Sequence, residues 1–281
     1  MPATPMQLPE VTLCCVDTRD PALALWAMQR CMRQIRFADA ILFSSAALVP
    51  SPPPGVRLID VQVDTIEAYS RFMLRGLTPH VRTSHVLVVQ WDGFVRDASR
   101  WDPTFLELDY IGAPWREPIA GQWVGNGGFS LRSRRLLDAL LDPEVQITHP
   151  EDEAICVTNR ELLGVRHGVR IATPEVARRF SYERVEPTAP TFGFHGLFNF
   201  PRELSAAELS DFVAALPERL TRGLDAHDLC TWLIGAGRLN DAHALLDKRW
   251  RLGMRDRRTL RLAWRLRVAR WRRRAAARNG N

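Results

Sequence analysis

Four short segments of the sequence combine carboxylate, amide, glycine and histidine residues in ways that can do chemistry. They are Gln90-Trp-Asp-Gly93, Gly125-Asn-Gly-Gly128, His149-Pro-Glu-Asp-Glu153 and Phe192-Gly-Phe-His-Gly196. Each segment also has an ordinary structural interpretation. Because they are widely separated along the chain, they form one site only if the fold brings them together.

The first segment follows residues 84–89, an apolar run typical of a strand that is buried on both faces. A carboxylate at the end of such a strand, Asp92, can hold a divalent cation against a substrate diphosphate, because hard cations prefer oxygen ligands. The structural alternative is an aspartate that caps a turn.

The second segment places three glycines around Asn126. Glycine lets the backbone approach a ligand closely, so the N–H groups and the Asn126 amide can bind sugar hydroxyls or phosphate. No Gly-Lys-Ser/Thr follows, which excludes a P-loop. The alternative is a glycine turn before a strand and a helix over residues 133–141.

The third segment puts Glu151, Asp152 and Glu153 before a helical stretch at residues 154–163. Carboxylates there can simply cap the helix, where negative charge is favourable. The functional alternative is a general base that deprotonates an acceptor hydroxyl.

The fourth segment contains His195 between aromatic residues and glycines. A histidine in this setting is usually structural. It becomes a candidate ligand for a metal or a diphosphate if the fold brings it near Asp92.

The elements that must position these segments alternate between strand and helix. Strands are predicted at residues 11–16, 40–43, 56–61 and 84–89, and helices at 21–36 and 65–77. This alternation predicts an α/β fold with a mostly parallel sheet and helices on both faces. From Leu204 the pattern is helical, with a Ser205-x-x-Glu208 capping box and helices at 225–234 and 240–250.

Composition excludes several other classes of protein. The chain has 281 residues, of which 46% are hydrophobic and 25% charged, so it is neither disordered nor collagen-like. No apolar run is long enough for a transmembrane helix, and the first residues lack the features of a secretory signal. The five cysteines are odd in number and show no metal-binding spacing, so a cytoplasmic protein is expected.

Positive charge is concentrated in the C-terminal tail. Residues 248–281 contain 14 basic residues and one acidic residue, whereas the rest of the chain carries a net charge of −7. A helix over 257–274 would align Leu260, Trp264, Val268 and Trp271 among arginines. Three interpretations fit: a helix lying on an anionic membrane surface, a helix packed on its own domain, or nonspecific attraction to nucleic acid. The first is preferred, and no specific nucleic-acid partner is expected.

Taken together, the segments resemble a family of largely uncharacterised bacterial glycosyltransferase-like domains of the GT-A type, over residues 11–199. The resemblance is carried by Val11-Thr-Leu-Cys-Cys-Val-Asp-Thr-Arg19, Tyr69-Ser-Arg-Phe-Met-Leu74, Val88-Val-Gln-Trp-Asp-Gly-Phe-Val95, Asp109-Tyr-Ile-Gly-Ala-Pro-Trp115, Val124-Gly-Asn-Gly-Gly-Phe-Ser-Leu-Arg-Ser133, His149-Pro-Glu-Asp-Glu153 and Phe192-Gly-Phe-His-Gly196.

This resemblance implies a nucleotide-sugar donor bound over a Rossmann-like sheet, usually with Mn²⁺ or Mg²⁺ held by an Asp-x-Asp motif. Here the motif position reads Gln90-Trp-Asp92, so a neutral amide replaces the first aspartate, which counts against tight metal binding. His195 matches a late histidine that completes the metal or diphosphate site. The implied donor-binding residues are Asp17, Thr18, Arg19, Tyr69, Ser70, Arg71, Gln90, Asp92, Gly93, Asn126, Gly127 and Gly128.

The implied reaction is a direct displacement at the anomeric carbon. Asp152, with Glu151 or Glu153 nearby, would take the proton of the acceptor hydroxyl. Asp92 with a cation, helped by Arg71 and His195, would stabilise the leaving nucleoside diphosphate. The acceptor would be a bacterial surface polysaccharide or glycolipid precursor on the cytosolic side of the membrane.

Two other functions remain open from the sequence. A sugar nucleotidyltransferase is disfavoured because no glycine-rich loop with a following basic residue lies near the first strand. A catalytically silent carbohydrate- or protein-binding module is the second alternative to the transferase, and Gln90 in place of the first aspartate is the feature that supports it. The expected organisation is a transferase domain over 8–203, a helical hairpin region over 204–250 and an Arg-rich tail over 251–281.

Overall fold

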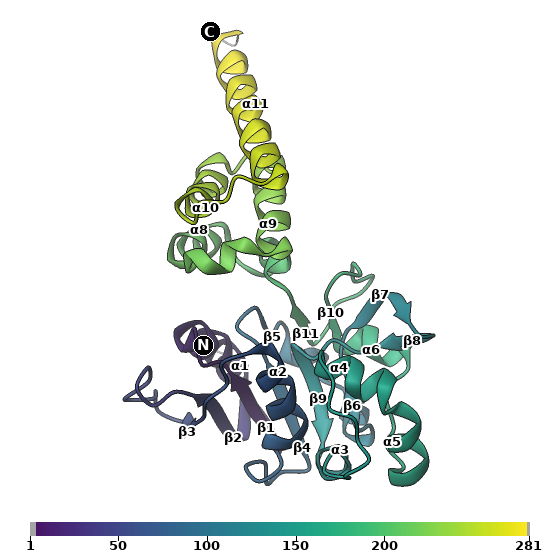
Figure 1. Ribbon diagram of the computed structural model, residues 1–281. Helices are drawn as coiled ribbons and strands as arrows, with labels where there is room; N and C mark the ends of the chain where they lie inside the picture. Colours follow the sequence, from purple (N-terminus) through teal and green to yellow (C-terminus); the bar gives the residue numbers. More distant parts are fainter. Residues whose placement is uncertain (1–3, 280–281) are drawn as a thin grey trace. The chain divides into compact units, whose positions relative to one another are not determined.

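The computed structural model describes residues 4–279, with the side chains described as far as residue 275. The chain divides into two compact units, one ending at His195 and the other beginning at Gly196 (Figure 1). The C-terminal helix, which the sequence analysis sets apart, belongs to the second unit together with the helices before it.

The first unit is built on a six-stranded sheet with the order β3-β2-β1-β4-β9-β6. The first four strands of this order are parallel, and β9 runs antiparallel to both of its neighbours. The predicted α/β class with a mostly parallel sheet is therefore confirmed. The strands span Arg57–Asp60 (β3), Ile35–Ser44 (β2), Met6–Val16 (β1), His85–Val89 (β4), Phe129–Ser133 (β9) and Tyr110–Ile111 (β6).

Both faces of this sheet are covered by helices. On one face, Cys14 and Val16 of β1 pack with Met73 and Leu77, which follow helix α2. Successive side chains of a strand point to opposite faces, so Leu13 and Cys15 face the other way, where helix α1 packs against β1 and β2. The helices of this unit are α1 (Pro21–Gln34), α2 (Ile66–Arg71) with a π-helical turn at Phe72–Gly76, α3 (Arg134–Ala139), α4 (Glu151–Glu153) with a π-helical turn at Ala154–Thr158, α5 (Arg160–His167) and α6 (Pro174–Phe180).

The predicted helix over 21–36 ends two residues early. Strand β2 begins at Ile35, and its pairing with β1 starts there, with Met6 opposite Ile35. The β-branched side chain of Ile35 is fully buried and suits a strand, so sheet pairing overrides the helical pattern.

Several short strands were not predicted. Strands β5 (Gly93–Val95), β10 (Ser181–Tyr182) and β11 (Gly193–His195) form a small sheet in which β11 lies between the other two. Strands β7 (Pro114–Ile119) and β8 (Gln122–Val124) form a hairpin. Short 3₁₀ turns at Ala98–Arg100 and Pro103–Glu107 connect β5 to β6.

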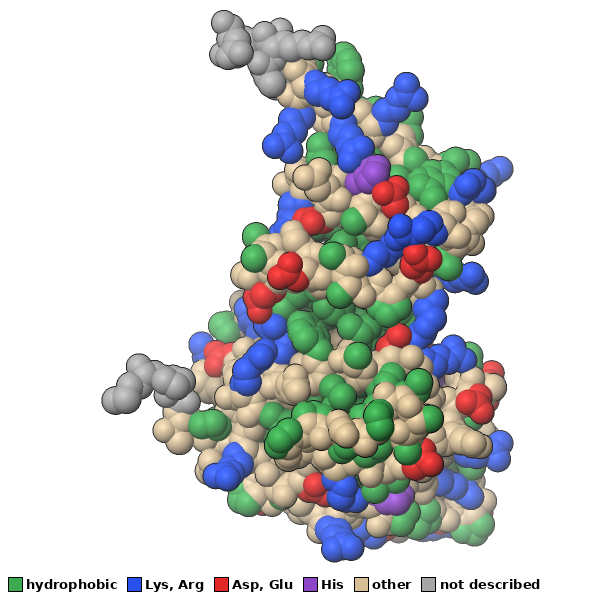
Figure 2. Space-filling view, turned by 90° about the vertical axis from the view of Figure 1, so that its left-hand side faces the viewer, with side chains coloured by type: hydrophobic (Ala, Val, Ile, Leu, Met, Phe, Trp, Pro, Cys, Tyr) green, Lys and Arg blue, Asp and Glu red, His purple; other side chains and the backbone are tan. Residues whose placement is uncertain are grey.

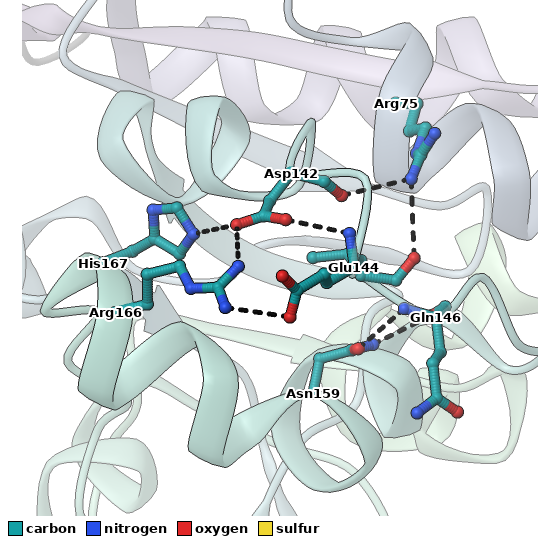
Figure 3. Close-up of polar contacts among 8 residues, drawn as sticks. Arg75, Asp142, Glu144, Gln146, Asn159, Arg166 and His167 are labelled. Carbon is teal, nitrogen blue, oxygen red and sulfur yellow. Dashed lines mark hydrogen bonds and ion pairs between the residues drawn. The ribbon is translucent and has the colours of Figure 1, made fainter.

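The connection between α3 and α4 is held by the polar cluster drawn in Figure 3. Asp142 Oδ2 lies 2.8 Å from His167 Nε2 and accepts a hydrogen bond of 3.0 Å from Arg166 Nη1. The Asn159 side chain bonds both the backbone N–H and the carbonyl of Gln146, at 2.8 Å each. These contacts fix the chain that leads into α4, where the three predicted carboxylates begin.

The second unit is helical. The capping box predicted at Ser205 and Glu208 is present, and the helices predicted at 225–234 and 240–250 correspond to α9 and α10. Lys248 is buried, and its ammonium group donates hydrogen bonds to the carbonyls of Val213, Ala214 and Leu216 at 2.6–2.8 Å. The unit comprises α7 (Phe200–Glu203), α8 (Ala206–Ala215), α9 (Leu224–Gly235), α10 (Leu239–Arg251) and α11 (Arg257–Asn279), with 3₁₀ turns at Leu197–Asn199 and Glu218–Arg222.

Among the described residues, no helix combines the length and the apolar character needed to cross a membrane.

Candidate functional site

The site lies where the strand order of the main sheet reverses. From β1 the chain adds β2 and β3 on one side, and β4 pairs with β1 on the other. In open α/β sheets, ligands bind at the carboxyl ends of the strands at this reversal. Here those ends lead into Asp17-Thr18-Arg19 after β1 and Gln90-Trp91-Asp92 after β4.

His195 is brought to the end of β4 by the small sheet. Strand β11 pairs with β5 in antiparallel register, so His195 lies opposite Gly93. Its Nε2 atom is 3.1 Å from Gln90 Oε1 and 3.2 Å from Asp92 Oδ1, while its Nδ1 atom is 3.3 Å from Glu183 Oε1. Burial alone would lower the pKa of His195, but the two carboxylates outweigh it and raise the pKa well above 6.5. The two carboxylates therefore favour the protonated form of the ring.

Glu183 is a site residue that the sequence analysis missed. It follows β10, and it reaches His195 only because β10 pairs with β11. Both strands are too short to leave a pattern in the sequence, so no local signal marks Glu183.

Gln90 is held at both ends of its amide. Its Nε2 donates to the hydroxyl of Tyr69 at 2.8 Å, and its Oε1 faces His195. Burial raises the pKa of Tyr69 well above 10, so this phenol stays protonated. The neutral amide thus links a residue after β4 to helix α2 and to β11, a linkage that needs a donor and an acceptor on one side chain.

The glycine segment lies against these residues. The carbonyl of Gly128 accepts a hydrogen bond of 2.8 Å from the N–H of Gln90. A Cβ atom on Gly128 would stand 2.1 Å from His195 Nε2, and one on Gly127 would stand 2.1 Å from Glu151 Oε1. Asn126 has φ +57°, a left-handed conformation that asparagine tolerates better than most residues. A side chain at Gly128 would displace the His195 ring, and one at Gly127 would displace the Glu151 carboxylate from its buried position.

The three consecutive carboxylates have different surroundings. Asp152 is half-buried, and its Oδ2 accepts a hydrogen bond of 2.8 Å from the N–H of Asn126. Its Oδ1 accepts one of 3.0 Å from the N–H of Glu153. Glu153 is also half-buried, and its carboxylate forms no hydrogen bond or ion pair within the described part of the chain.

Glu151 differs from its two neighbours because it is buried against an arginine. Its Oε1 lies 3.1 Å from Arg132 Nη2, and the Arg132 side chain is completely buried. Burial raises the pKa of Glu151, although the positive charge of Arg132 opposes this shift. Glu151 is thus committed to a core ion pair, which leaves Asp152 and Glu153 as the more accessible carboxylates.

Arg132 is the second residue that the sequence analysis missed. It lies in β9, where every residue is buried, and its guanidinium stands over the ring of Tyr110. The signal was available, because an arginine inside a buried strand must be paired.

The residues after β1 are engaged in local contacts. Asp17 Oδ1 accepts hydrogen bonds from the N–H groups of Arg19 and Asp20, which caps the turn into α1. Thr18 donates to the carbonyl of Val63 at 2.6 Å, and Arg19 donates to the carbonyl of Asp64 at 2.6 Å. These contacts fix the segment before α2 beside the end of β1.

Ser70 and Arg71 of α2 are also predicted to face the diphosphate, but neither of them is hydrogen-bonded to Gln90 as Tyr69 is. Ser70 is buried, and its Oγ lies 2.8 Å from His149 Nδ1, so it joins α2 to the segment before α4. Arg71 is exposed, and its guanidinium group has no hydrogen bond or ion pair with residues 4–279.

The described residues of the site supply only some of the ligands that a divalent cation needs. Asp92 Oδ1 is buried without a hydrogen bond, and His195 Nε2 and Gln90 Oε1 lie beside it. The carboxylate and the amide oxygen suit Mg²⁺ or Mn²⁺, whereas the imidazole suits the transition metal Mn²⁺ better than Mg²⁺, and Glu183 would orient the imidazole. However, no cluster of three or more His, Cys, Asp or Glu residues able to hold a metal occurs within the described residues. His195 would also have to lose its proton to bind the metal.

Comparison with known proteins gives a match to one family model and a partial likeness to several solved structures. Residues 56–195 match the family model described as "Protein of unknown function (DUF5672)". No curated protein matches the sequence. One similar solved structure is the galactosyltransferase LgtC in complex with donor and acceptor sugar analogues, whose sequence is 15% identical to this chain. The TM-score is 0.43, and the match covers 66% of this chain and 86% of LgtC.

Two further solved structures give similar values. A glycosyltransferase involved in glycosylation of the major capsid of PBCV-1 is 14% identical, with a TM-score of 0.39 over 66% of this chain and 92% of that one. Mouse xyloside xylosyltransferase 1 is 10% identical, with a TM-score of 0.45 over 68% of this chain and 98% of that one.

Proposed function

We propose that the first unit is a glycosyltransferase that moves a sugar from a nucleotide-sugar to a hydroxyl of a glycan or glycolipid. The observation that carries the proposal is the contact between the four chemically capable segments. Gln90 and Asp92 meet His195, His195 lies on Gly128, and Asn126 bonds Asp152. The sequence resemblance to GT-A domains supports the same function.

In this proposal Asp152 is the general base. Its carboxylate is oriented by the N–H groups of Asn126 and Glu153, and it is only half-buried, so an acceptor hydroxyl can reach it. It would accept the hydroxyl proton as the acceptor oxygen attacks the anomeric carbon and the bond from that carbon to the diphosphate breaks. Glu151 would support this geometry through its ion pair with Arg132.

The diphosphate would lie near the ends of β1 and β4. His195, held as an imidazolium by Asp92 and Glu183, would offer positive charge to the leaving group. Arg71, exposed on α2, is available for the phosphate oxygens, which its planar guanidinium suits. A divalent cation held by Asp92 and a deprotonated His195 would supply this positive charge in place of the imidazolium.

The acceptor and location are part of the proposal. A bacterial surface polysaccharide or glycolipid precursor would be met at the cytosolic face of the membrane, so we place the enzyme in the cytoplasm or peripherally on that face.

Release of nucleoside diphosphate from a panel of nucleotide-sugars, measured with and without Mn²⁺, tests the function. The wild-type chain should release nucleoside diphosphate, and Asp152→Asn should reduce turnover by about a hundredfold or more, the range of general-base catalysis. Donor binding, followed by thermal shift, should be unchanged in this variant. Glu161→Gln, on exposed residue Glu161 of α5, is the matched control and should retain full turnover.

Three outcomes would contradict the proposal in different ways. Unchanged turnover in Asp152→Asn would remove the general base. Pyrophosphate release would indicate a nucleotidyltransferase. Absence of both donor binding and turnover would favour a silent binding module, for which the fully engaged amide of Gln90 is the supporting observation.

A further inference from the structure

As far as its side chains are described, to residue 275, helix α11 has one apolar face packed within the second unit and a second one that is exposed. Thr259, Leu262 and Leu266 are buried, and α11 contacts α9 and α10. In contrast, Leu260 is 51% exposed, Trp264 65% and Trp271 68%. The predicted apolar stripe is therefore the unpacked face of the helix.

Helical geometry places the two faces on opposite sides. At about 100° per residue, Leu260, Trp264, Val268 and Trp271 fall within an arc of about 80°, and the buried residues lie roughly opposite. Val268 is half-buried and continues the exposed stripe between the two tryptophans. Two large aromatic rings exposed on one helix face are uncommon on a surface that meets only water.

Arginines border this outer face on both sides. By the same geometry, Arg261, Arg265 and Arg272 lie about 60° to 100° from its centre on one flank, and Arg267 and Arg274 about 60° to 80° on the other. Figure 2 shows the Arg side chains crowding this helix. No acidic residue occurs between Arg257 and Asn279.

We propose that the outer face of α11 binds the surface of a bilayer that contains anionic phospholipid, with the helix lying in the plane of the interface. The Trp and Leu side chains would enter the boundary between headgroups and acyl chains, and the flanking guanidinium groups would bind lipid phosphates. The aliphatic Leu260 and Val268 favour lipid over nucleic acid, because they gain from burial in acyl chains and nothing from a phosphate backbone. This inference is independent of the proposed transferase activity.

Sedimentation of the full chain with vesicles, in the absence of nucleotide-sugar, tests the inference. The protein should bind vesicles of phosphatidylcholine mixed with phosphatidylglycerol, bind vesicles of phosphatidylcholine alone at least about tenfold more weakly, and be released by high salt. Trp264→Ser combined with Trp271→Ser should weaken binding to the mixed vesicles about tenfold or more. Trp123→Ser, at a tryptophan in β8 that is 44% exposed, is the matched control and should bind like wild type.

Brominated acyl chains give a second readout. They should quench part of the tryptophan fluorescence in the wild type and in Trp123→Ser, and markedly less in the double variant. Because the two substituted rings are exposed, the double variant should fold, which its circular dichroism spectrum checks.

Absence of binding to the mixed vesicles would overturn the inference, as would equal binding by wild type and the double variant. Preferential binding to duplex DNA or RNA that survives loss of both tryptophans would identify α11 as a cationic nucleic-acid surface instead.

Discussion

The imidazole of His195 rests on the backbone of Gly128, with so little space between them that a Cβ atom on Gly128 would stand 2.1 Å from Nε2. The same glycine accepts the backbone hydrogen bond of Gln90, whose amide faces the histidine. One residue without a side chain therefore sets the spacing between the loop before β9, the end of β4 and strand β11.

Gly128→Ala should force His195 away from Asp92. We expect a loss of about 1–3 kcal/mol of unfolding free energy, the usual effect of overpacking a buried position. Urea unfolding measures it. Gly164→Ala in the middle of α5 is the control: the nearest atom to its Cβ would be 4.0 Å away, so this change should be neutral or stabilise by up to about 1 kcal/mol.

A second substitution separates the clash between residue 128 and the His195 ring from other effects of Gly128→Ala. In a His195→Ala background the added methyl group has room, so Gly128→Ala should cost much less there. Additive losses in the double variant would show that the two residues do not constrain each other.

The buried ion pair of Arg132 and Glu151 predicts a loss of stability when one of its two charges is removed. Arg132→Met should destabilise the first unit by about 3–5 kcal/mol, because it leaves a buried carboxylate without its partner. Arg132→Met combined with Glu151→Leu should recover a large part of this loss in chemical unfolding. Arg178→Met, which breaks only an exposed pair with Glu175, should cost about 1 kcal/mol or less. If Arg132→Met lowered the unfolding free energy as little as Arg178→Met does, the ion pair would not be needed to keep α4 in place.

The cluster around Asp142 predicts how stability depends on pH. Hydrogen bonds from the N–H of Glu144, from His167 and from Arg166 lower the pKa of Asp142 from 3.8 to about 2. A carboxyl whose pKa is lower in the folded state stabilises the fold above its unfolded pKa. The contribution is therefore complete above about pH 4 and is lost as the pH falls toward 2.

Asp142→Asn should consequently lower the melting temperature at neutral pH, and the gap to wild type should close as the pH approaches 2. Thermal unfolding at a series of pH values measures the gap. Asp138→Asn, at an exposed position in α3, is the control and should leave the pH profile unchanged. A gap that stays constant down to pH 2 would contradict the assigned hydrogen bonds.

Much of the main sheet could be predicted, because its strands carry long apolar runs. The run at 84–89 marks β4, and the strand–helix alternation before it predicts a mostly parallel sheet, although not the order of its strands. The short strands could not be predicted, since two or three residues leave no periodicity. The contact of His195 with Asp92 depends on these short strands. The sequence therefore predicts a role for His195 only if the fold brings it near Asp92.

The C-terminal helix shows a different limit of the sequence. Its existence and its apolar stripe were predictable, but Leu262 and Leu266 form a second set at helical spacing. Periodicity cannot decide which of two apolar faces packs, because that choice depends on the shape of α9 and α10. The stripe that contains both tryptophans is the more obvious one in sequence, yet it is the one left exposed.

Lys248 is the only lysine in the chain, and its ammonium group is buried on three carbonyl oxygens at the end of α8. Amine-selective acylating reagents therefore find no ready target among the side chains, despite the alkaline isoelectric point. Acylation of Lys248 requires α8 and α10 to separate, so the rate of acylation would measure how often the helical unit opens.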